Sequence, residues 1–465
     1  MCRLAPWMFV ALALVLVAGC SPRVDNTAHV APLRTFVETT PAWVEQSALG
    51  KRLWAVERAF YESRGFMPAW VDGDRTTPHM KELVAQFKYS ELHGLDPARY
   101  PREEFQQLRD TSQTHMGTRF PVDRVPELDA KLTYAYLRYA ADLIGWTTSP
   151  AQVSPHWLTD PKEDDLAARL TAAIKGNRIR PSLEALAPSH PQYKGLQAAL
   201  VRERQQPTGN IDRLLMNLER WRWAPRDLGE RYILVNVAAY MLQVMEGDTP
   251  ALSMRVIVGK PDTQTPLFSD EMTYVVFSPY WNIPENILRD ETLPRVVSDP
   301  GFLDRNNMEV VGTSGTVDPE SIDWSDESST KGMRFRQRPG PDNALGLVKF
   351  LFPNHFSIYL HDTPSDRLFF REKRPLSHGC IRVENPVGLA QYVLRDQPEW
   401  TAPRITSAMN SGREQGVKLT KTLPVHIGYW TAWVQPDGTV LLTDDPYNID
   451  AAHAAAVARR PKITG

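Results

Sequence analysis

The chain has 465 residues, of which 53 are Lys or Arg and 55 are Asp or Glu, so its formal net charge at pH 7 is −2. This balance disfavours a nucleic-acid-binding protein, which would carry a basic excess or a basic face. The length is typical of two or three domains. Beyond the N-terminus, no apolar run is long enough to span a bilayer.

The first 19 residues have the features of a secretory signal peptide. Arg3 supplies one positive charge, and the uncharged apolar run Met8–Val17 follows it. This run is shorter than a membrane-spanning helix requires. We therefore expect an exported protein, with residues 1–19 removed.

The residues before Cys20 suggest a lipid anchor. Small residues, Val17-Ala18-Gly19, precede this cysteine in a pattern similar to the lipobox of bacterial lipoproteins, where the cysteine is acylated. Each buried acyl methylene contributes about 0.8 kcal/mol to membrane binding. The alternative is an ordinary signal peptide with a chance cysteine. We expect Cys20 to be lipidated and the protein to be held in the periplasm, at the outer membrane if Ser21 acts as it does in enteric bacteria.

Residues 20–40 are polar and are expected to form a tether. Apolar residues then recur at helical spacing through residues 41–210, and the longest such stretch is Leu128–Ile144, with its apolar side chains expected on one side. This predicts a helical domain. Residues 211–228 are expected to contain a linking helix.

The pattern changes at residue 229 to short alternating segments separated by turns, which predicts a mostly antiparallel sheet or sandwich over residues 229–410. Residues 291–347 interrupt it and are rich in Gly, Pro, Asp and Ser; long ordered loops of this kind are usually functional, and we expect a cap. Residues 411–465 are expected to form a hairpin and tail. The predicted strands are Tyr232–Val237, Tyr240–Met245, Met254–Gly259, Tyr274–Pro279, Phe356–His361, Thr431–Val434 and Thr439–Leu442.

Cys380 is the only cysteine outside the N-terminal segment, since the other two are Cys2 and Cys20. It cannot form an internal disulfide in the mature chain, so it is either an inert buried thiol or a nucleophile. A thiol attacks an acyl carbon as thiolate and needs a nearby imidazole to hold the proton. His361 ends a predicted strand, where a sheet would fix it at the edge of a groove.

The residues around Cys380 add further chemistry. Gly379 permits a tight turn whose backbone N–H groups could form an oxyanion hole. Arg382 lies two residues beyond Cys380 and would project to the same side of an extended segment, where it could bind a carboxylate. Zinc is an alternative, with His361, His378 and Cys380 as three ligands, although no further cysteine or paired histidine completes a set.

The run Ser377-His378-Gly379-Cys380-Ile381-Arg382, with His361 upstream, resembles the signature of the L,D-transpeptidase (YkuD-like) catalytic domain. Further motifs resemble the larger periplasmic branch of that family, and the likeness covers roughly residues 50 to 450. These motifs are Asn217–Trp223, Phe277–Pro284, Pro339–Phe350 and Tyr359–Pro364.

The resemblance implies an α+β fold, in which a helical N-terminal scaffold domain precedes a mostly antiparallel β-sandwich with a capping insertion. It implies Cys380 as nucleophile, His361 as proton donor and acceptor, and backbone groups at Gly379 and Cys380 as the oxyanion hole. His378, Arg382 and Tyr359 would line the substrate site. Neither a cofactor nor a metal is implied. Asp362 or a backbone carbonyl could orient the histidine.

The resemblance also implies an enzyme of the cell wall that joins peptidoglycan tetrapeptide stems by 3→3 cross-links through a cysteine thioester, and that carbapenems acylate. The acceptor could instead be water, a free D-amino acid or an outer-membrane lipoprotein. A cysteine peptidase that trims stems and an idle wall-binding scaffold are further alternatives; the intact Cys380 and His361 disfavour the latter. Only Gln192–Asn210 lies where many relatives carry a peptidoglycan-binding module, so wall affinity must come from elsewhere.

Overall fold

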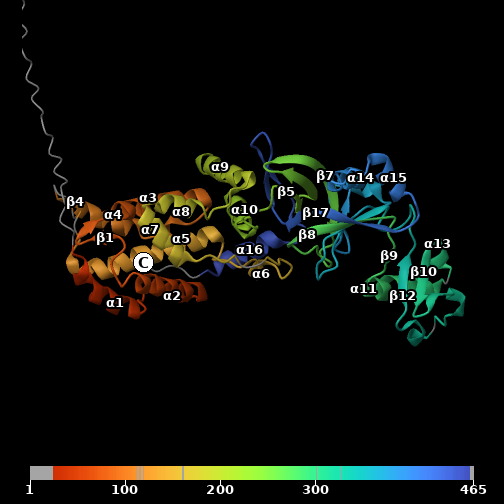
Figure 1. Cartoon of the computed structure of the whole chain (residues 1–465), viewed down its shortest axis with the longest axis horizontal. Coiled ribbons are helices and arrows are strands. Elements are labelled where there is room, and N and C mark those ends of the chain that lie inside the picture. Colours follow the sequence, from red (N-terminus) through yellow and green to blue (C-terminus); the bar gives the residue numbers. More distant parts are fainter. Residues whose placement is uncertain are drawn as a thin grey trace, which may run out of the picture.

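The computed structural model describes residues 25–460, apart from residues 112, 115, 116, 119, 160, 161, 300 and 325. The predicted signal peptide and the lipidation site Cys20 lie outside these residues. The molecule is elongated, with a helical part at one end, a β-rich part in the middle and a small mixed unit at the other end (Figure 1). No helix in the described ranges combines the length and apolar character needed to cross a membrane.

The helical domain is built around α5, Val125–Ile144. Its side chains are buried on nearly all sides, not on the one side that the sequence pattern predicted, because helices surround it. It ends at Gly145, which adopts a left-handed conformation with φ 91° as is common just after a helix. The other helices of this part are α1 (Val30–Glu38), α2 (Ala48–Ser63), α3 (Pro78–Gln86), α4 (Arg102–Thr111), α7 (Leu166–Gly176) and α8 (Ile179–Glu184). Helix α9 (Pro191–Gln205) follows them, and its buried residues belong to a separate apolar cluster.

Helix α1 corrects the expectation that residues 20–40 form only a tether. Leu33 and Val37 lie one helical turn apart and are both buried in the core of the helical domain. Two apolar residues at this spacing are enough to attach a short helix to a larger core, although they give a weak pattern in the sequence.

Helix α10 (Ile211–Trp223) lies in the segment where a linking helix was expected. Its Trp221 stacks between His190 and Trp430, with ring centroids 4.3 Å and 4.4 Å away. Two further short helices lie near it, α6 (Pro150–Val153) and α16 (Ile449–Ala458). Figure 1 shows α10, α6 and α16 between the helical and β-rich parts.

The β-rich part is a sheet that returns on itself. The strand order is β15-β7-β16-β14-β13-β8-β17-β5-β6, and β6 also pairs with β7. Most pairs are antiparallel; β14–β16, β15–β7 and β17–β5 are parallel. The strands are β5 (Arg231–Asn236), β6 (Met241–Glu246), β7 (Thr249–Gly259), β8 (Ser269–Phe277), β13 (Val348–Leu351), β14 (Leu360–His361), β15 (Pro375–Ser377), β16 (Ile381–Val383) and β17 (Gln415–Gly428).

Two expectations about this sheet need correction. The predicted domain end at residue 410 is wrong, because β17 lies between β8 and β5 inside the sheet. The predicted strand Phe356–His361 is shortened to Leu360–His361, because Ser357 has a positive φ of 55° that extended strands do not use. The helices α14 (Pro386–Val393) and α15 (Ala402–Met409) add to the core on this side. The hairpin of β18 (Ala432–Val434) and β19 (Val440–Leu442) forms as predicted.

The insertion between β8 and β13 folds into a unit of its own. Its strands have the order β11-β10-β12-β9, and its buried residues form a separate apolar cluster. The unit begins with β9 (Trp281–Asn282), ahead of the predicted start at residue 291, and lies apart from the main sheet in Figure 1. Its other elements are α11 (Glu285–Ile287), η5 (Leu288–Thr292), α12 (Leu293–Ser298), α13 (Phe302–Arg305), β10 (Met308–Gly312), β11 (Gly315–Val317) and β12 (Arg334–Gln337). We refer to residues 281–343 as the cap.

Candidate active site

Strand pairing brings the predicted site residues together. Strand β16 runs parallel to β14, with His361 opposite Arg382. Cys380 occupies the tight turn just before β16, and Gly379 beside it has φ 118°, a conformation that favours glycine. Cys380, His361, Arg382 and Tyr359 therefore line one cavity of about 710 Å³.

The hydrogen bonding of His361 fixes which ring nitrogen can accept a proton. Its Nδ1 lies 2.6 Å from the backbone oxygen of Asp362. A carbonyl oxygen only accepts, so Nδ1 carries the hydrogen and Nε2 is left as the acceptor. The carboxylate of Asp362 accepts instead from the N–H groups of Leu347 and Thr363. Of the two orienting groups considered from the sequence, the backbone carbonyl is the one that contacts the ring.

Both members of the expected pair are neutral at rest. Burial, aided by the charge of Arg382, lowers the pKa of His361 to about 3. Burial raises the pKa of Cys380 to about 11, against the opposing effect of hydrogen bonds from Tyr359. A neutral imidazole with a free Nε2 is suited to act as a general base toward a neutral thiol. This differs from a site that stores a preformed thiolate.

The thiol is half-buried and lies at the edge of the cavity. Its Sγ is 3.6 Å from the backbone oxygen of Ser357, and among the described residues it forms no hydrogen bond with His361. The ring of Tyr359 is 5.7 Å from that of His361, and burial raises the pKa of its hydroxyl. The tyrosine therefore packs against both members of the pair.

The cation Arg382 has no carboxylate partner in the described part of the chain. Its Nε is buried without a hydrogen-bond partner there. Glu384, the partner considered from the sequence, pairs with Arg255, whose Nε lies 2.9 Å from Oε1 of the glutamate. A buried guanidinium donor without an acceptor is unfavourable, and a ligand carboxylate would satisfy it.

The backbone of the turn differs from the expected oxyanion hole at one donor. The N–H of Gly379 donates to Oγ of Ser377 at 3.2 Å, so it is already engaged. The N–H of Cys380 forms no hydrogen bond within the described residues. Ser377 also donates to the backbone oxygen of Cys380 at 2.5 Å. The Cys380 N–H, and not that of Gly379, is the available donor.

The cap supplies one wall of the cavity. Glu291 of the cap lies with Oε1 2.6 Å from Nε2 of His378, the residue expected to line the substrate site. Trp281 of the cap and Tyr280, which precedes it, also line the cavity. The cap and the turn that carries Cys380 are thus in direct contact.

Comparisons with known proteins show the family of this chain. The Scaffold domain family matches residues 55–200, and the L,D-transpeptidase catalytic domain family matches residues 230–427. A protein of Haemophilus influenzae named "Putative L,D-transpeptidase" is 32% identical over 393 residues, which are 84% of this chain and 77% of that protein. The chain belongs to the L,D-transpeptidase family.

Two other similarities are much weaker. A solved L,D-transpeptidase from Mycobacterium smegmatis aligns with a TM-score of 0.21 and 14% identity, covering 43% of this chain and 58% of that one. "Epoxide hydrolase 1" of Sus scrofa is 29% identical over 84 residues, 18% of each chain. Neither similarity carries weight beside the family matches.

Two residues near the active site of this L,D-transpeptidase family member were not predicted from the sequence. Lys349 pairs with His361 in the register of β13 and β14, and burial lowers its pKa. Its Nζ is 3.7 Å from the Glu414 carboxylate. Glu291 was missed as well, because it lies 87 positions from its partner. His361, His378 and Cys380 do not cluster as metal ligands: within the described ranges, no three His, Cys, Asp or Glu side chains do so.

Proposed function

We propose that the protein is a peptidoglycan L,D-transpeptidase that forms 3→3 cross-links between diaminopimelate residues. The observation that supports this most is the neutral thiol–imidazole pair beside the unpartnered guanidinium of Arg382 in one cavity. The pair supplies acyl-transfer chemistry, and the guanidinium suits the carboxylates of stem peptides. Family membership supports the same reaction class.

In the first step, Sγ of Cys380 attacks the carbonyl carbon between the L-centre of diaminopimelate and the terminal D-alanine. The thiol proton passes to Nε2 of His361 as the carbon–sulfur bond forms. The Cys380 N–H stabilises the resulting oxyanion. Collapse of this intermediate breaks the carbon–nitrogen bond, His361 returns the proton to the leaving amine, and D-alanine departs from a thioester.

In the second step, the side-chain amine of another diaminopimelate attacks the thioester carbon. His361 takes the proton from this amine and returns it to the sulfur of Cys380 as the thioester breaks. The new amide is the cross-link and the free thiol is regenerated. Water as the acceptor would give trimmed stems instead of dimers.

The decisive experiment incubates the purified protein with tetrapeptide muropeptides and analyses the products by mass spectrometry. We expect 3→3 dimers and free D-alanine. Cys380→Ser should form no acyl-enzyme with stems or with a carbapenem, and His361→Ala should slow acylation by about 10²- to 10⁴-fold. Trimmed monomers without dimers would favour a carboxypeptidase, and unchanged substrate would favour a non-catalytic wall-binding protein.

We also propose that the enzyme works in the periplasm, held to the outer membrane by a lipid on Cys20. The lipobox-like residues before Cys20 support this. The variant Cys20→Ala should not be acylated, and osmotic shock should therefore release it from the cells. Retention of that variant in detergent-extracted membranes would contradict the anchor.

A further inference from the structure

A buried threonine far from the signature holds the turn that carries Cys380. Oγ1 of Thr265 donates to the backbone oxygen of Gly379 at 2.7 Å and accepts from the N–H of Gly259 at 2.9 Å. The side chain is fully buried, so water does not compete for either bond. The loop between β7 and β8 is thereby joined to the nucleophile turn.

This bond determines which way the next N–H points. The peptide between Gly379 and Cys380 is planar and trans, as no cis peptide occurs in the described chain, so its N–H points opposite to its carbonyl. With that carbonyl directed to Thr265, the Cys380 N–H faces away from Thr265. This Cys380 N–H has no hydrogen-bond acceptor among the described residues.

The threonine is in turn held by Tyr447, from a segment beyond the part matched by the catalytic-domain family. The hydroxyl of Tyr447 accepts from the N–H of Thr265 at 3.1 Å and donates to the backbone oxygen of Gly259 at 2.7 Å. The hydroxyls of Thr265 and Tyr447 therefore each donate one hydrogen bond and accept one. Three of the four bonds close a ring through Gly259, Thr265 and Tyr447, and the fourth joins this ring to the carbonyl of Gly379.

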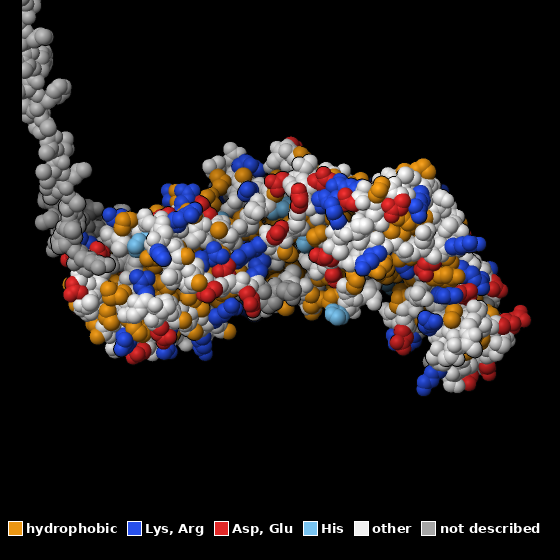
Figure 2. All heavy atoms as spheres, in the orientation of Figure 1, with side chains coloured by type: hydrophobic (Ala, Val, Ile, Leu, Met, Phe, Trp, Pro, Cys, Tyr) orange, Lys and Arg blue, Asp and Glu red, His pale blue; other side chains and the backbone are white. Residues whose placement is uncertain are grey.

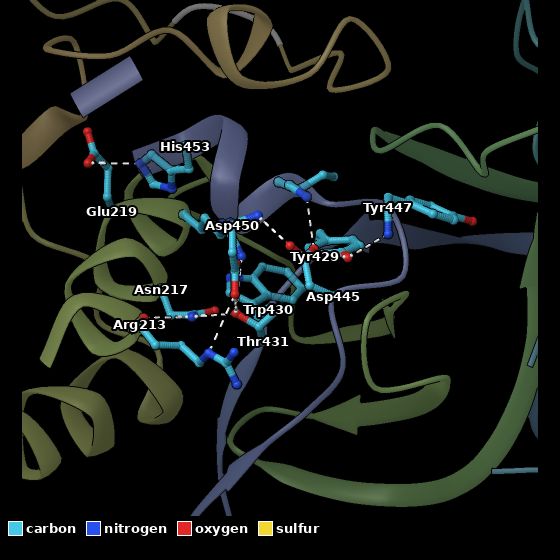
Figure 3. Close-up of polar contacts among 12 residues, drawn as sticks. Arg213, Asn217, Glu219, Tyr429, Trp430, Thr431, Asp445, Tyr447, Asp450 and His453 are labelled. Atoms are coloured by element: carbon cyan, nitrogen blue, oxygen red, sulfur yellow. Dashed lines mark hydrogen bonds and ion pairs between the residues drawn. The ribbon is translucent and has the colours of Figure 1, made fainter. Parts of the chain in front are cut away.

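The segment around Tyr447 is itself held by a polar network (Figure 3). The hydroxyl of Tyr429 donates to Asp445 at 2.5 Å and accepts from the N–H of Tyr447 at 3.1 Å. Asp445 accepts from the N–H of Asp450 at 2.8 Å, and Asp450 pairs with Arg220 of α10 at 2.7 Å. Tyr447 is therefore a fixed support and not a mobile surface residue.

We propose that Thr265, held by Tyr447, is a positioning residue that aims the Cys380 N–H at the oxyanion formed during acyl transfer. This inference rests on the proposed function. Thr265 touches neither substrate nor the reacting atoms; it acts through the Gly379–Cys380 peptide. Without its hydroxyl, the Gly379 carbonyl loses its partner and the peptide plane is free to rotate, which misdirects the donor.

The test compares two reactions of the same thiol. Acylation by a carbapenem or a tetrapeptide stem passes through an oxyanion, whereas alkylation by iodoacetamide is a displacement at carbon that forms none. We expect Thr265→Val to slow acylation by about 10- to 100-fold, below the 10²- to 10³-fold typical of removing an oxyanion donor outright. Alkylation should stay within about twofold, with an unchanged pH profile, because the thiol–imidazole pair is intact.

Conservative variants and matched controls separate positioning from stability. Thr265→Ser keeps the hydroxyl and should restore most of the acylation rate, and Tyr447→Phe should slow acylation by a smaller factor than Thr265→Val. Thr133→Val removes an equally buried hydroxyl in the helical domain, and Tyr392→Phe removes a tyrosine hydrogen bond to Glu246 on the surface. Neither control should change the ratio of the two rates.

The inference is overturned if Thr265→Val and Tyr447→Phe leave the ratio of acylation to alkylation at its wild-type value. This holds if both rates fall together with the melting temperature, and also if neither rate changes. Should Thr265→Val fail to fold, the ratio measured for Tyr447→Phe decides the question, because Thr265→Ser keeps the hydroxyl and is expected to stay close to wild type. Failure of the wild-type protein to form an acyl-enzyme with either substrate would overturn the proposed function and this inference together. Wild-type acylation with an unchanged ratio in the variants would overturn the inference alone.

Discussion

Glu291 and His378 join the cap to the nucleophile turn, with 2.6 Å between the carboxylate oxygen and Nε2 of the imidazole. Both residues line the cavity, and each is partly open to solvent. An exposed pair of this kind contributes at most about 1 kcal/mol. Its main effect is therefore expected on the position of the cap and not on the stability of the fold.

The first prediction concerns this contact. Glu291→Ala should raise KM for tetrapeptide stems by about threefold, the factor that corresponds to a fraction of a kcal/mol, and leave kcat and the melting temperature nearly unchanged. Steady-state kinetics with purified stems would measure this. Glu285→Ala, which removes a cap carboxylate that does not line the cavity, is the control. An equal KM in both variants would show that the contact does not hold the cap for substrate.

The second prediction is a flat pH profile for acylation. The pKa of His361 is depressed to about 3, so its neutral base form persists above that pH and is lost only as pH falls through it. The pKa of Cys380 is raised to about 11, so the thiol persists below that pH. General-base attack should therefore proceed at a near-constant rate between about pH 5 and pH 9.

Stopped-flow acylation by a carbapenem across this range would check the profile. A rate that rises about tenfold per pH unit would instead indicate reaction through free thiolate, without help from the imidazole. Lys349→Met is an informative companion variant, because the charge of Lys349 helps to lower the pKa of His361. Without this charge the pKa of His361 should rise, so the fall of the acylation rate at acidic pH should begin at a higher pH in this variant.

Local patterns in the sequence predicted the parts of the fold that local contacts hold. The hairpin of β5 and β6 and the linking helix α10 were predicted because each is defined by neighbouring residues. Strand β17 was missed because its partners lie more than a hundred positions away. In addition, most residues in the N-terminal half of the strand are exposed, so this half has no clear apolar pattern. Period-two patterns do not reveal such long-range pairing.

The candidate site divides in the same way. Cys380, His361 and Arg382 belong to recognisable motifs, and parallel pairing of β14 with β16 explains why they meet. Thr265 and Tyr447 have no such signal, since they lie 114 and 188 positions from the backbone groups they bind. The hydrogen bond that engages the N–H of Gly379 also depends on the rotamer of Ser377, which no sequence pattern specifies.

The composition also agrees with the surface of the molecule. Figure 2 shows basic and acidic side chains interspersed over the visible face, in line with the near-neutral charge.

The third prediction concerns the conformation of Gly379. Its φ of 118° is one that other residues rarely adopt, and an added Cβ would lie 3.2 Å from Cδ1 of Ile358. Gly379→Ala should rotate the turn and reduce acylation by about 10²-fold or more, comparable to loss of an oxyanion donor. Gly412→Ala is the control, because it also has a positive φ but open space around it. Equal acylation rates in the two variants would contradict a special role for the turn.

The fourth prediction tests Arg382 as the receptor for a substrate carboxylate. Burial lowers its pKa, and its Nε is buried without a partner among the described residues. A charge-assisted hydrogen bond contributes about 1.5–3 kcal/mol, so Arg382→Ala should reduce dimer formation from tetrapeptide stems by roughly ten- to hundredfold. Carbapenem acylation should fall much less, because the strained ring of the inhibitor depends less on a bound carboxylate. Arg382→Lys should recover only part of the loss, since an ammonium lacks the bidentate geometry.

The matched control for Arg382 is Arg255→Ala, which removes the guanidinium that pairs with Glu384 outside the cavity. It should lower the melting temperature slightly and leave both reactions at comparable rates. Mass spectrometry of each variant with both substrates gives the two losses side by side. If Arg382→Ala lowers the stem and carbapenem reactions by the same factor, or changes only the melting temperature, Arg382 supports the fold and does not read the substrate. A loss confined to stems, absent from Arg255→Ala, would place the carboxylate of the stem at this guanidinium.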